Sequence, residues 1–333
     1  MEECNGFPYI YIHLNFAFKP KKMKKVLISI AQITPVFLNR AETMKKALKA
    51  IDAAGKKGAK LIVFPEAFLP GYPEWVLVNP PGKKPLTNPL YEALLDNSVG
   101  IPDDTTAQLC KAAKKAGIYI AMGVNERNTE GSNASMYNTV LYIDSNGNIM
   151  GKHRKLIPTS GERLVWAPGD GSTLDVYDTP FGKLGGLICW ENYMPLARYA
   201  MYAWGTQIYV APTWDYGDVW VSTLRHIAKE GGMFVMGACM PMKMSDIPDK
   251  YQFKKQYDPK KEWINPGNSV IINPKGDIIA GPLNKEEGIL YAEIDLSEIP
   301  ASKWSLDVAG HYARPDVFKL SVNKKANKVI DEE

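Results

Sequence analysis

The chain has 333 residues, 45% of them hydrophobic and 23% charged, which is the composition of a globular protein with ample material for a core. A formal net charge of +4, with charges of both signs interspersed, argues against a nucleic-acid-binding surface. The apolar runs are shorter than the roughly 18 residues of a membrane-spanning helix. The four cysteines form no Cys-x-x-Cys pair, which favours a reducing cytoplasm over a disulfide scaffold or a zinc site.

Residues 1–24 have an unusual charge order. The acids Glu2 and Glu3 precede two short apolar runs and lysines follow them, whereas a signal peptide has basic residues first. We therefore expect residues 1–24 to be an extension outside the core, and Met23 offers an alternative start. Because no linker or repeat divides the rest, we expect one domain over residues 25–320, with a C-terminal tail over 299–333 that is marked by proline and charge.

The first regular elements form a strand–helix–strand unit. Val26–Ile33 is β-rich and uninterrupted, as expected of a strand covered on both faces. Asn39–Lys57 carries apolar residues at helical spacing, with Asn39 as its N-cap, and Leu61–Phe64 is the next buried strand. Such a unit predicts two parallel strands joined by a right-handed crossover.

Two long irregular segments interrupt the later pattern. Leu69–Asn97 is rich in proline, glycine and aromatic residues, with a short helix near Tyr91–Asn97, and Met240–Ile264 is the second segment. Long loops in compact domains are usually functional or disordered, and the aromatic residues favour order in the first. Helices are also predicted at Asp103–Ala116, Pro195–Gly205 and Val219–Glu230. Further strands are predicted at Ile118–Asn125, Tyr137–Ile143, Asn148–Lys152, Leu174–Tyr177, Lys183–Ile188, Gln207–Ala211, Met233–Cys239, Ser269–Ile272, Ile278–Ala280 and Ile289–Ile294.

The order of these elements indicates an α/β fold. Strands alternate with helices in the first part of the chain, and hairpins join strands later. The pattern fits either one mixed sheet or a pair of sheets flanked by helices, and periodicity does not choose between them.

Three polar residues follow apolar strands, where α/β sheets gather catalytic groups. They are Glu66, Lys155 and Cys189. A cysteine is mostly a neutral thiol at neutral pH, so a carboxylate that takes its proton and an ammonium that stabilises negative charge would make it reactive. Taken singly, each residue also has a structural interpretation, because free cysteine is among the most buried residue types and Lys155 lies in a basic run.

Other reaction schemes lack their residues. None of the four histidines has the local context of a cysteine protease. The sequence contains no Gly-x-Ser-x-Gly elbow, no phosphate-binding or dinucleotide-binding glycine pattern and no metal-ligand spacing. We therefore expect neither a metal nor a cofactor, and a Cys–Glu–Lys scheme remains.

Four segments in the same chain resemble the motifs of the carbon–nitrogen hydrolase (nitrilase) superfamily. The match runs from about Val26 to Phe318. The form Cys189-Trp190-Glu191-Asn192, with Ala211-Pro212-Thr213 downstream, resembles the nitrile-hydrolysing branch, whereas amidase branches tend to carry a different residue pair after the cysteine. The four segments are Phe64–Pro73 around the glutamate, His153–Leu156 with Pro158-Thr159 and Glu162-Arg163 around the lysine, Cys189–Leu196 around the cysteine, and Gly310–Phe318 in the tail.

The resemblance implies a fold, an assembly and a reaction. The fold is a four-layer α–β–β–α sandwich with two mixed sheets flanked by helices. The assembly is a homo-oligomer, either a dimer or a larger form such as a spiral. The reaction is hydrolysis of a small-molecule nitrile by water to a carboxylic acid and ammonia, through a cysteine thioimidate and thioester. An amidase of the same superfamily, a cyanide-converting enzyme and a non-catalytic binding protein remain alternatives.

The resemblance also implies residue roles. Cys189 is the nucleophile, Glu66 the general base and Lys155 the cation that stabilises developing negative charge, with Glu162 holding Lys155 and the substrate in position. Trp190, Tyr72 and Trp214 are candidates for the pocket wall, although each is equally compatible with a core position. His311 in the tail motif either supports the site or is structural.

Overall fold

The computed structural model describes residues 25–330. The expected extension over residues 1–24 therefore lies outside the described residues. No helix in residues 25–330 is both long and apolar enough to cross a membrane.

The first of two sheets contains the predicted strand–helix–strand unit. Its strands are β1 (Val26–Gln32), β2 (Leu61–Val63), β3 (Tyr119–Arg127), β4 (Met136–Ile143), β5 (Ile149–Arg154) and β13 (Gly288–Ile294). Their order is β13-β1-β2-β3-β4-β5. β1, β2 and β3 are parallel, as the crossover predicts, and the other neighbours are antiparallel.

Within residues 25–330, the second sheet has seven strands. They are β6 (Val176–Thr179), β7 (Gly182–Gly186), β8 (Ile208–Thr213), β9 (Phe234–Cys239), β10 (Pro241–Lys243), β11 (Trp263–Ile272) and β12 (Ile278–Asn284). The order is β10-β11-β9-β8-β7-β6, and β12 pairs with β11. The central strands β7, β8 and β9 are parallel, so this sheet is mixed like the first.

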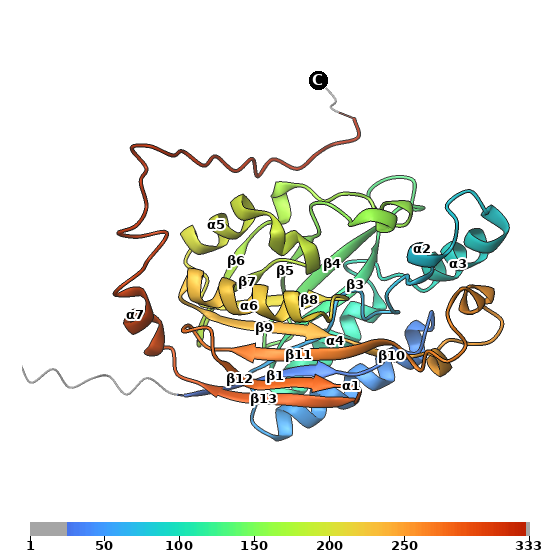
Figure 1. Ribbon diagram of the computed structural model, residues 1–333, viewed down its shortest axis with the longest axis horizontal. Coiled ribbons are helices and arrows are strands. Elements are labelled where there is room, and N and C mark those ends of the chain that lie inside the picture. The colour runs from blue at the N-terminus through green and yellow to red at the C-terminus, as the bar shows by residue number, and fades with distance from the viewer. Residues whose placement is uncertain (1–24, 331–333) are drawn as a thin grey trace, which may run out of the picture.

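Helices cover the two outer faces. The α-helices are α1 (Arg40–Lys56), α2 (Trp75–Val78), α3 (Lys84–Asp96), α4 (Asp104–Ala116), α5 (Pro195–Ala203), α6 (Asp218–Gly231) and α7 (Glu298–Lys303). Short 3-10 turns are η1 (Ser160–Leu164), η2 (Gly171–Thr173), η3 (Cys189–Tyr193), η4 (Met244–Asp246) and η5 (Gln252–Gln256). In Figure 1, α1 and α5 lie on opposite sides of the two sheets.

Three apolar layers separate the sheets and helices. They show that the chain forms two sheets rather than one mixed sheet, a choice that periodicity left open. Between the sheets, side chains such as Ile28 and Val63 share one cluster with Val210 of the second sheet. Ile62, the neighbour of Val63, points the other way and packs with α1 and α4, as strand alternation requires. Leu224 of α6 belongs to a third cluster on the far face of the second sheet. The protein is therefore a four-layer α–β–β–α sandwich, as the resemblance implies.

The predicted boundaries differ from the structure mainly in the two long segments. Asn39 caps α1 as expected, accepting a hydrogen bond from Glu42 N–H. The predicted short helix near Tyr91–Asn97 is instead α3, which begins at Lys84 because Pro85 occupies its first turn, where proline is tolerated. Met240–Ile264 was predicted to be irregular, which is wrong at both ends, since β10 and the start of β11 lie within it.

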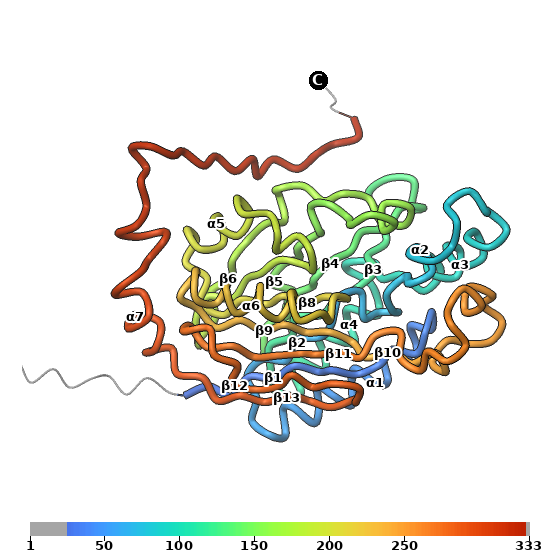
Figure 2. The backbone as a smooth tube through the Cα atoms, viewed as in Figure 1, coloured from blue at the N-terminus to red at the C-terminus, as the bar shows by residue number. Residues whose placement is uncertain are grey.

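The C-terminal tail leaves the sandwich after α7. Figure 2 shows it as an extended red tube that runs around one side of the molecule and over α5. The tail contacts the body again near its end, where Asn327 N–H donates to Asp170 Oδ2 at 2.7 Å and Lys324 lies 3.3 Å from Asp175.

One glycine allows the turn after β2 to pack against β3. A Cβ atom on Gly123 would lie 1.9 Å from Pro65 O and 2.8 Å from Ala67 N, and both are backbone atoms that flank Glu66. Gly82, in contrast, has open space around its Cβ position.

We predict that Gly123→Ala lowers thermal stability and that Gly82→Ala does not. The added methyl group must displace the backbone at residues 65–67, an overpacking that typically costs about 1–3 kcal/mol. The measurement is the midpoint of thermal unfolding by circular dichroism at one scan rate. Equal midpoints for the two variants would contradict the close approach.

Candidate active site

Side chains from both sheets meet at one buried cluster. Glu66 follows β2, Lys155 follows β5, and Cys189 begins the turn η3 that follows β7. Glu66 and Lys155 are fully or almost fully buried, and Cys189 is 5% exposed. The structure therefore brings together the three residues that the sequence placed at separate strand ends.

Lys155 is held by two carboxylates. Its ammonium lies 2.9 Å from Glu66 Oε1 and 2.8 Å from Glu162 Oε2. Burial alone lowers the pKa of Lys155, but Glu66, Cys189 and Glu162 act in the opposite direction and hold that pKa above its usual value. Lys155 therefore stays protonated at this position, and both Glu66 and Glu162 pair with its ammonium.

Glu162 is fixed from three directions. Its Oε2 accepts hydrogen bonds from Lys155 and from Thr159 N–H, at 2.8 and 2.6 Å. Its Oε1 accepts from the Tyr72 hydroxyl at 2.7 Å. With each oxygen engaged, Glu162 is suited to orienting the ammonium rather than to taking a proton.

Glu66 has one engaged oxygen and one free oxygen. Oε1 accepts from Lys155 Nζ and from Asn138 Nδ2, at 2.9 and 2.6 Å. Oε2 is buried and has no hydrogen-bond partner within residues 25–330. Burial is the main cause that raises the pKa of Glu66; Glu162 adds to the rise, whereas Lys155 and Asn138 oppose it. A buried acceptor without a donor is uncommon in folded proteins, and a free lone pair is what a general base requires.

Cys189 is a neutral thiol in this environment. Burial, with Glu66 and Glu162, raises the pKa of Cys189 to about 12, although Lys155 and Thr213 lower it. The sulfur therefore needs a base to become a nucleophile. Its backbone has φ of 52°, in the left-handed region that is costly for a residue with a side chain.

Asn192 holds the strained turn. Its Nδ2 donates to the carbonyls of Leu187 and Cys189, at 2.9 and 2.8 Å, and its Oδ1 accepts from the Tyr209 hydroxyl at 2.7 Å. These bonds satisfy two backbone carbonyls that follow β7 and tie the cysteine turn to β8.

Glu191 joins the cysteine turn to the lysine turn. Its carboxylate accepts from Ile188 N–H and Leu156 N–H, each at 2.8 Å, and contacts His153 Nε2 at 2.9 Å. Burial raises the pKa of Glu191, but His153 and the two backbone donors outweigh it and hold that pKa below its usual value. Sequence reasoning quoted Glu191 only as part of the Cys-Trp-Glu-Asn pattern and missed this bridging role.

Asn125 and Asn138 are also site residues that the sequence reasoning missed. Asn125 Nδ2 donates to the carbonyls of Ala67, Leu69 and Gly71, and so shapes the loop after Glu66. Asn138 donates to Glu66 itself. Both asparagines interrupt apolar strands, and a polar amide at a buried strand position is the signal that could have identified them.

Two of the three aromatic candidates are buried together, and the third is exposed. Tyr72 and Trp214 stack with ring centroids 4.6 Å apart, and Trp166 packs edge-on against Tyr72 at 5.6 Å. Tyr72 and Trp214 are buried, so they form a wall beside Glu162. Trp190 is 50% exposed, and its indole donates to Asp215 Oδ2 at 2.7 Å.

His311 lies apart from the cluster. It is an exposed residue of the tail, and its ring packs edge-on against Tyr312 at 5.3 Å. No contact within residues 25–330 joins it to Glu66, Lys155 or Cys189 in this chain. In the same described part, no group of three or more histidine, cysteine, aspartate or glutamate side chains could hold a metal ion.

Comparison with known proteins places the chain in a family. A family model described as carbon-nitrogen hydrolase matches residues 27–303. An aliphatic nitrilase of Sinorhizobium fredii is 41% identical over 315 residues, which cover 92% of this chain and 99% of that protein. Nitrilase 1 of Arabidopsis thaliana is 42% identical over 316 residues, which cover 92% of this chain and 89% of that protein.

A solved structure supports the fold. The NitFhit protein of C. elegans superposes with a TM-score of 0.69 at 21% identity, and the match covers 92% of this chain and 69% of that one. On the family model and on relatives of about 40% identity over nearly the whole chain, the protein belongs to the carbon-nitrogen hydrolase family.

Proposed function

We propose that the protein is a nitrilase that converts an organic nitrile and two waters into a carboxylic acid and ammonia. The observation that carries the proposal is the buried Glu66, with one oxygen on Lys155 and the other free, in one cluster with the Cys189 thiol. The choice of nitrile over amide rests on the relatives of about 40% identity that are named nitrilases.

The first half of the reaction makes a thioimidate. Glu66 Oε2 takes the proton of Cys189 as the sulfur attacks the nitrile carbon, and the proton is then delivered to the nitrogen. Lys155 stabilises the negative charge that develops on that nitrogen, together with the backbone N–H of Trp190. Because Lys155 is already desolvated and fixed between two carboxylates, it needs no rearrangement as this charge appears.

The second half releases the products. Glu66 activates a water against the thioimidate, and the tetrahedral intermediate loses ammonia to leave a thioester. A second water, again activated by Glu66, hydrolyses the thioester and regenerates the thiol. Glu162 keeps Lys155 in place throughout, and Tyr72 keeps Glu162 in place. The stacked rings of Tyr72 and Trp214 form part of the pocket wall, and Trp190 lies at its outer edge.

Cys189→Ala is expected to abolish release of ammonia and acid from every nitrile in a panel, because it removes the sulfur that forms the thioimidate. Cys110→Ala is the matched control, since Cys110 lies half-buried on α4. The panel is assayed beside the matching amides, so that an amidase preference would also be seen. Ammonia release by Cys189→Ala would refute the nucleophile.

Glu66→Gln is expected to fold normally and to lose about a thousandfold or more in kcat, within the range of general-base catalysis. The amide keeps an oxygen for Lys155 but cannot take a proton at the second position. Glu92→Gln, an exposed change on α3, is the control. Near-normal turnover by a folded Glu66→Gln enzyme would exclude Glu66 as the base.

We propose that the chain forms a homodimer or larger oligomer through the face of α5 and α6. Leu196 on α5 and Val219 on α6 are 68% and 74% exposed, and larger exposed apolar patches mark interaction surfaces. A groove of about 1150 Å³ between α5 and the tail adds Val317 and Phe318 to this apolar surface. These features favour burial against a second copy.

Leu196→Glu combined with Val219→Glu is expected to shift the protein to a smaller species, because two buried charges would oppose association. The measurement is molar mass by size exclusion with light scattering. Ile279→Glu, on β12, is the control change of an exposed aliphatic residue. An unchanged mass for the double variant, at the value of the parent protein, would exclude this face as the interface.

A further inference from the structure

The Cys189 sulfur has a hydrogen-bond donor that the reaction scheme above does not use. Thr213, the last residue of β8, is fully buried, and its hydroxyl donates to Cys189 Sγ across 3.3 Å. β8 lies next to β7 in the second sheet, so the ends of these parallel strands bring the two residues together.

The orientation of the hydroxyl is fixed by a neighbouring backbone group. Asp215 N–H donates to Thr213 Oγ1 at 2.8 Å. A hydroxyl has one proton and two lone pairs, so a donor on the oxygen directs the proton elsewhere, and Cys189 Sγ is the acceptor at that position.

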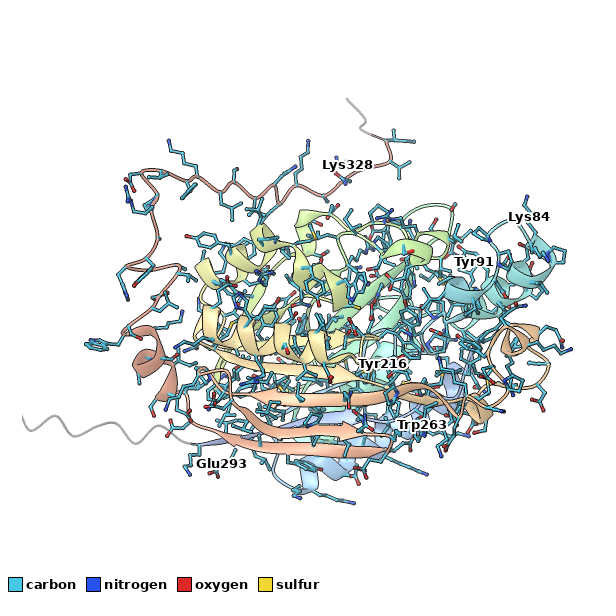
Figure 3. All side chains as sticks on the ribbon, viewed as in Figure 1. Lys84, Tyr91, Tyr216, Trp263, Glu293 and Lys328 are labelled. Carbon is cyan, nitrogen blue, oxygen red and sulfur yellow. The ribbon has the colours of Figure 1, made fainter. Side chains whose placement is uncertain are left out.

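Asp215 is itself well anchored. Its carboxylate accepts from Gly217 N–H at 2.9 Å and from the Trp190 indole at 2.7 Å. The turn after β8 therefore holds two groups in place. One is the Thr213 hydroxyl, and the other is the side chain of Trp190, the residue that follows Cys189. Tyr216, labelled in Figure 3, lies in the same segment between β8 and α6.

The charges around the sulfur explain why such a donor matters. Glu66 and Glu162 oppose formation of a thiolate, Lys155 favours it, and burial opposes it most. Tyr72 and Cys239 also interact electrostatically with Cys189, and burial is the main cause that raises the pKa of both side chains. Lys155 is shared with two carboxylates, which leaves the thiolate with less than a full counter-charge.

We propose that Thr213 is a further catalytic residue, whose hydroxyl stabilises the Cys189 thiolate each time the proton resides on Glu66. The proposal rests on Cys189 being the nucleophile. In the attack, the S–H proton passes to Glu66, the sulfur electron pair forms the S–C bond, and Glu66 returns the proton to nitrogen. In the last step, Glu66 takes a proton from water, hydroxide adds to the thioester carbon, the C–S bond breaks with its pair on sulfur, and Glu66 reprotonates the sulfur.

The test compares Thr213→Val, which removes the hydroxyl at nearly constant shape, with Thr213→Ser, which keeps it. Thr213→Val is expected to lower kcat by roughly ten- to a hundredfold, the effect of one hydrogen bond to a charged group, with KM little changed. At each pH below the pKa of Cys189, alkylation of Cys189 by iodoacetamide should be about tenfold slower in Thr213→Val than in the parent, which corresponds to a pKa about one unit higher. Thr213→Ser should restore both properties.

Controls separate this proposal from the proposed function. Alkylation is read as the rate that is lost in Cys189→Ala, because Cys239 is a second buried thiol. Circular dichroism establishes folding, and Thr213→Ala is used with the same expectation if Thr213→Val does not fold. Parent-like kcat and alkylation profiles in a folded Thr213→Val or Thr213→Ala enzyme overturn the role of Thr213. Nitrile hydrolysis by Cys189→Ala overturns the proposed function itself.

Discussion

The buried ammonium of Lys155 is the interaction on which the site depends. A desolvated charge is costly unless it is paired, so Lys155 requires Glu66 and Glu162 as much as they require it. The two carboxylates that pair with Lys155 differ in their other hydrogen bonds. Glu162 has both oxygens engaged and acts as a support, whereas Glu66 keeps one oxygen free beside a neutral thiol. In the proposed reaction, this geometry separates a positioning carboxylate, Glu162, from the proton acceptor, Glu66.

The cluster spans two sheets, so its precision depends on the bonds that join them. Glu191 provides the most direct link, because one carboxylate binds the backbone before Cys189 and the backbone after Lys155. Asn192 holds the left-handed backbone at Cys189, and Asn125 holds the loop after Glu66. Strain at Cys189 is therefore balanced by buried hydrogen bonds rather than by packing alone.

The sequence predicted most strands and helices and the three polar residues of the site. Its local pattern did not predict the two-sheet arrangement or the bridging role of Glu191. Uninterrupted apolar strands and the Asn39 cap were readable because they follow from local periodicity and hydrogen bonding. The local pattern of residues could not decide between one sheet and two, because β2 would bury both of its faces in either arrangement. Glu66, Lys155 and Cys189 were visible as polar ends of strands. The bridging role of Glu191 was hidden because its partners, Leu156 and His153, are distant in the sequence.

The proposed reaction requires one distribution of protons over Cys189, Lys155 and Glu66, and neutron diffraction of the resting enzyme at neutral pD locates them. We expect a deuteron on Cys189 Sγ, three deuterons on Lys155 Nζ and none on Glu66 Oε2. We also expect the Thr213 deuteron to point at the sulfur. A deuteron on Glu66 Oε2 with none on the sulfur would mean that a resting thiolate attacks without a base, and would contradict the account.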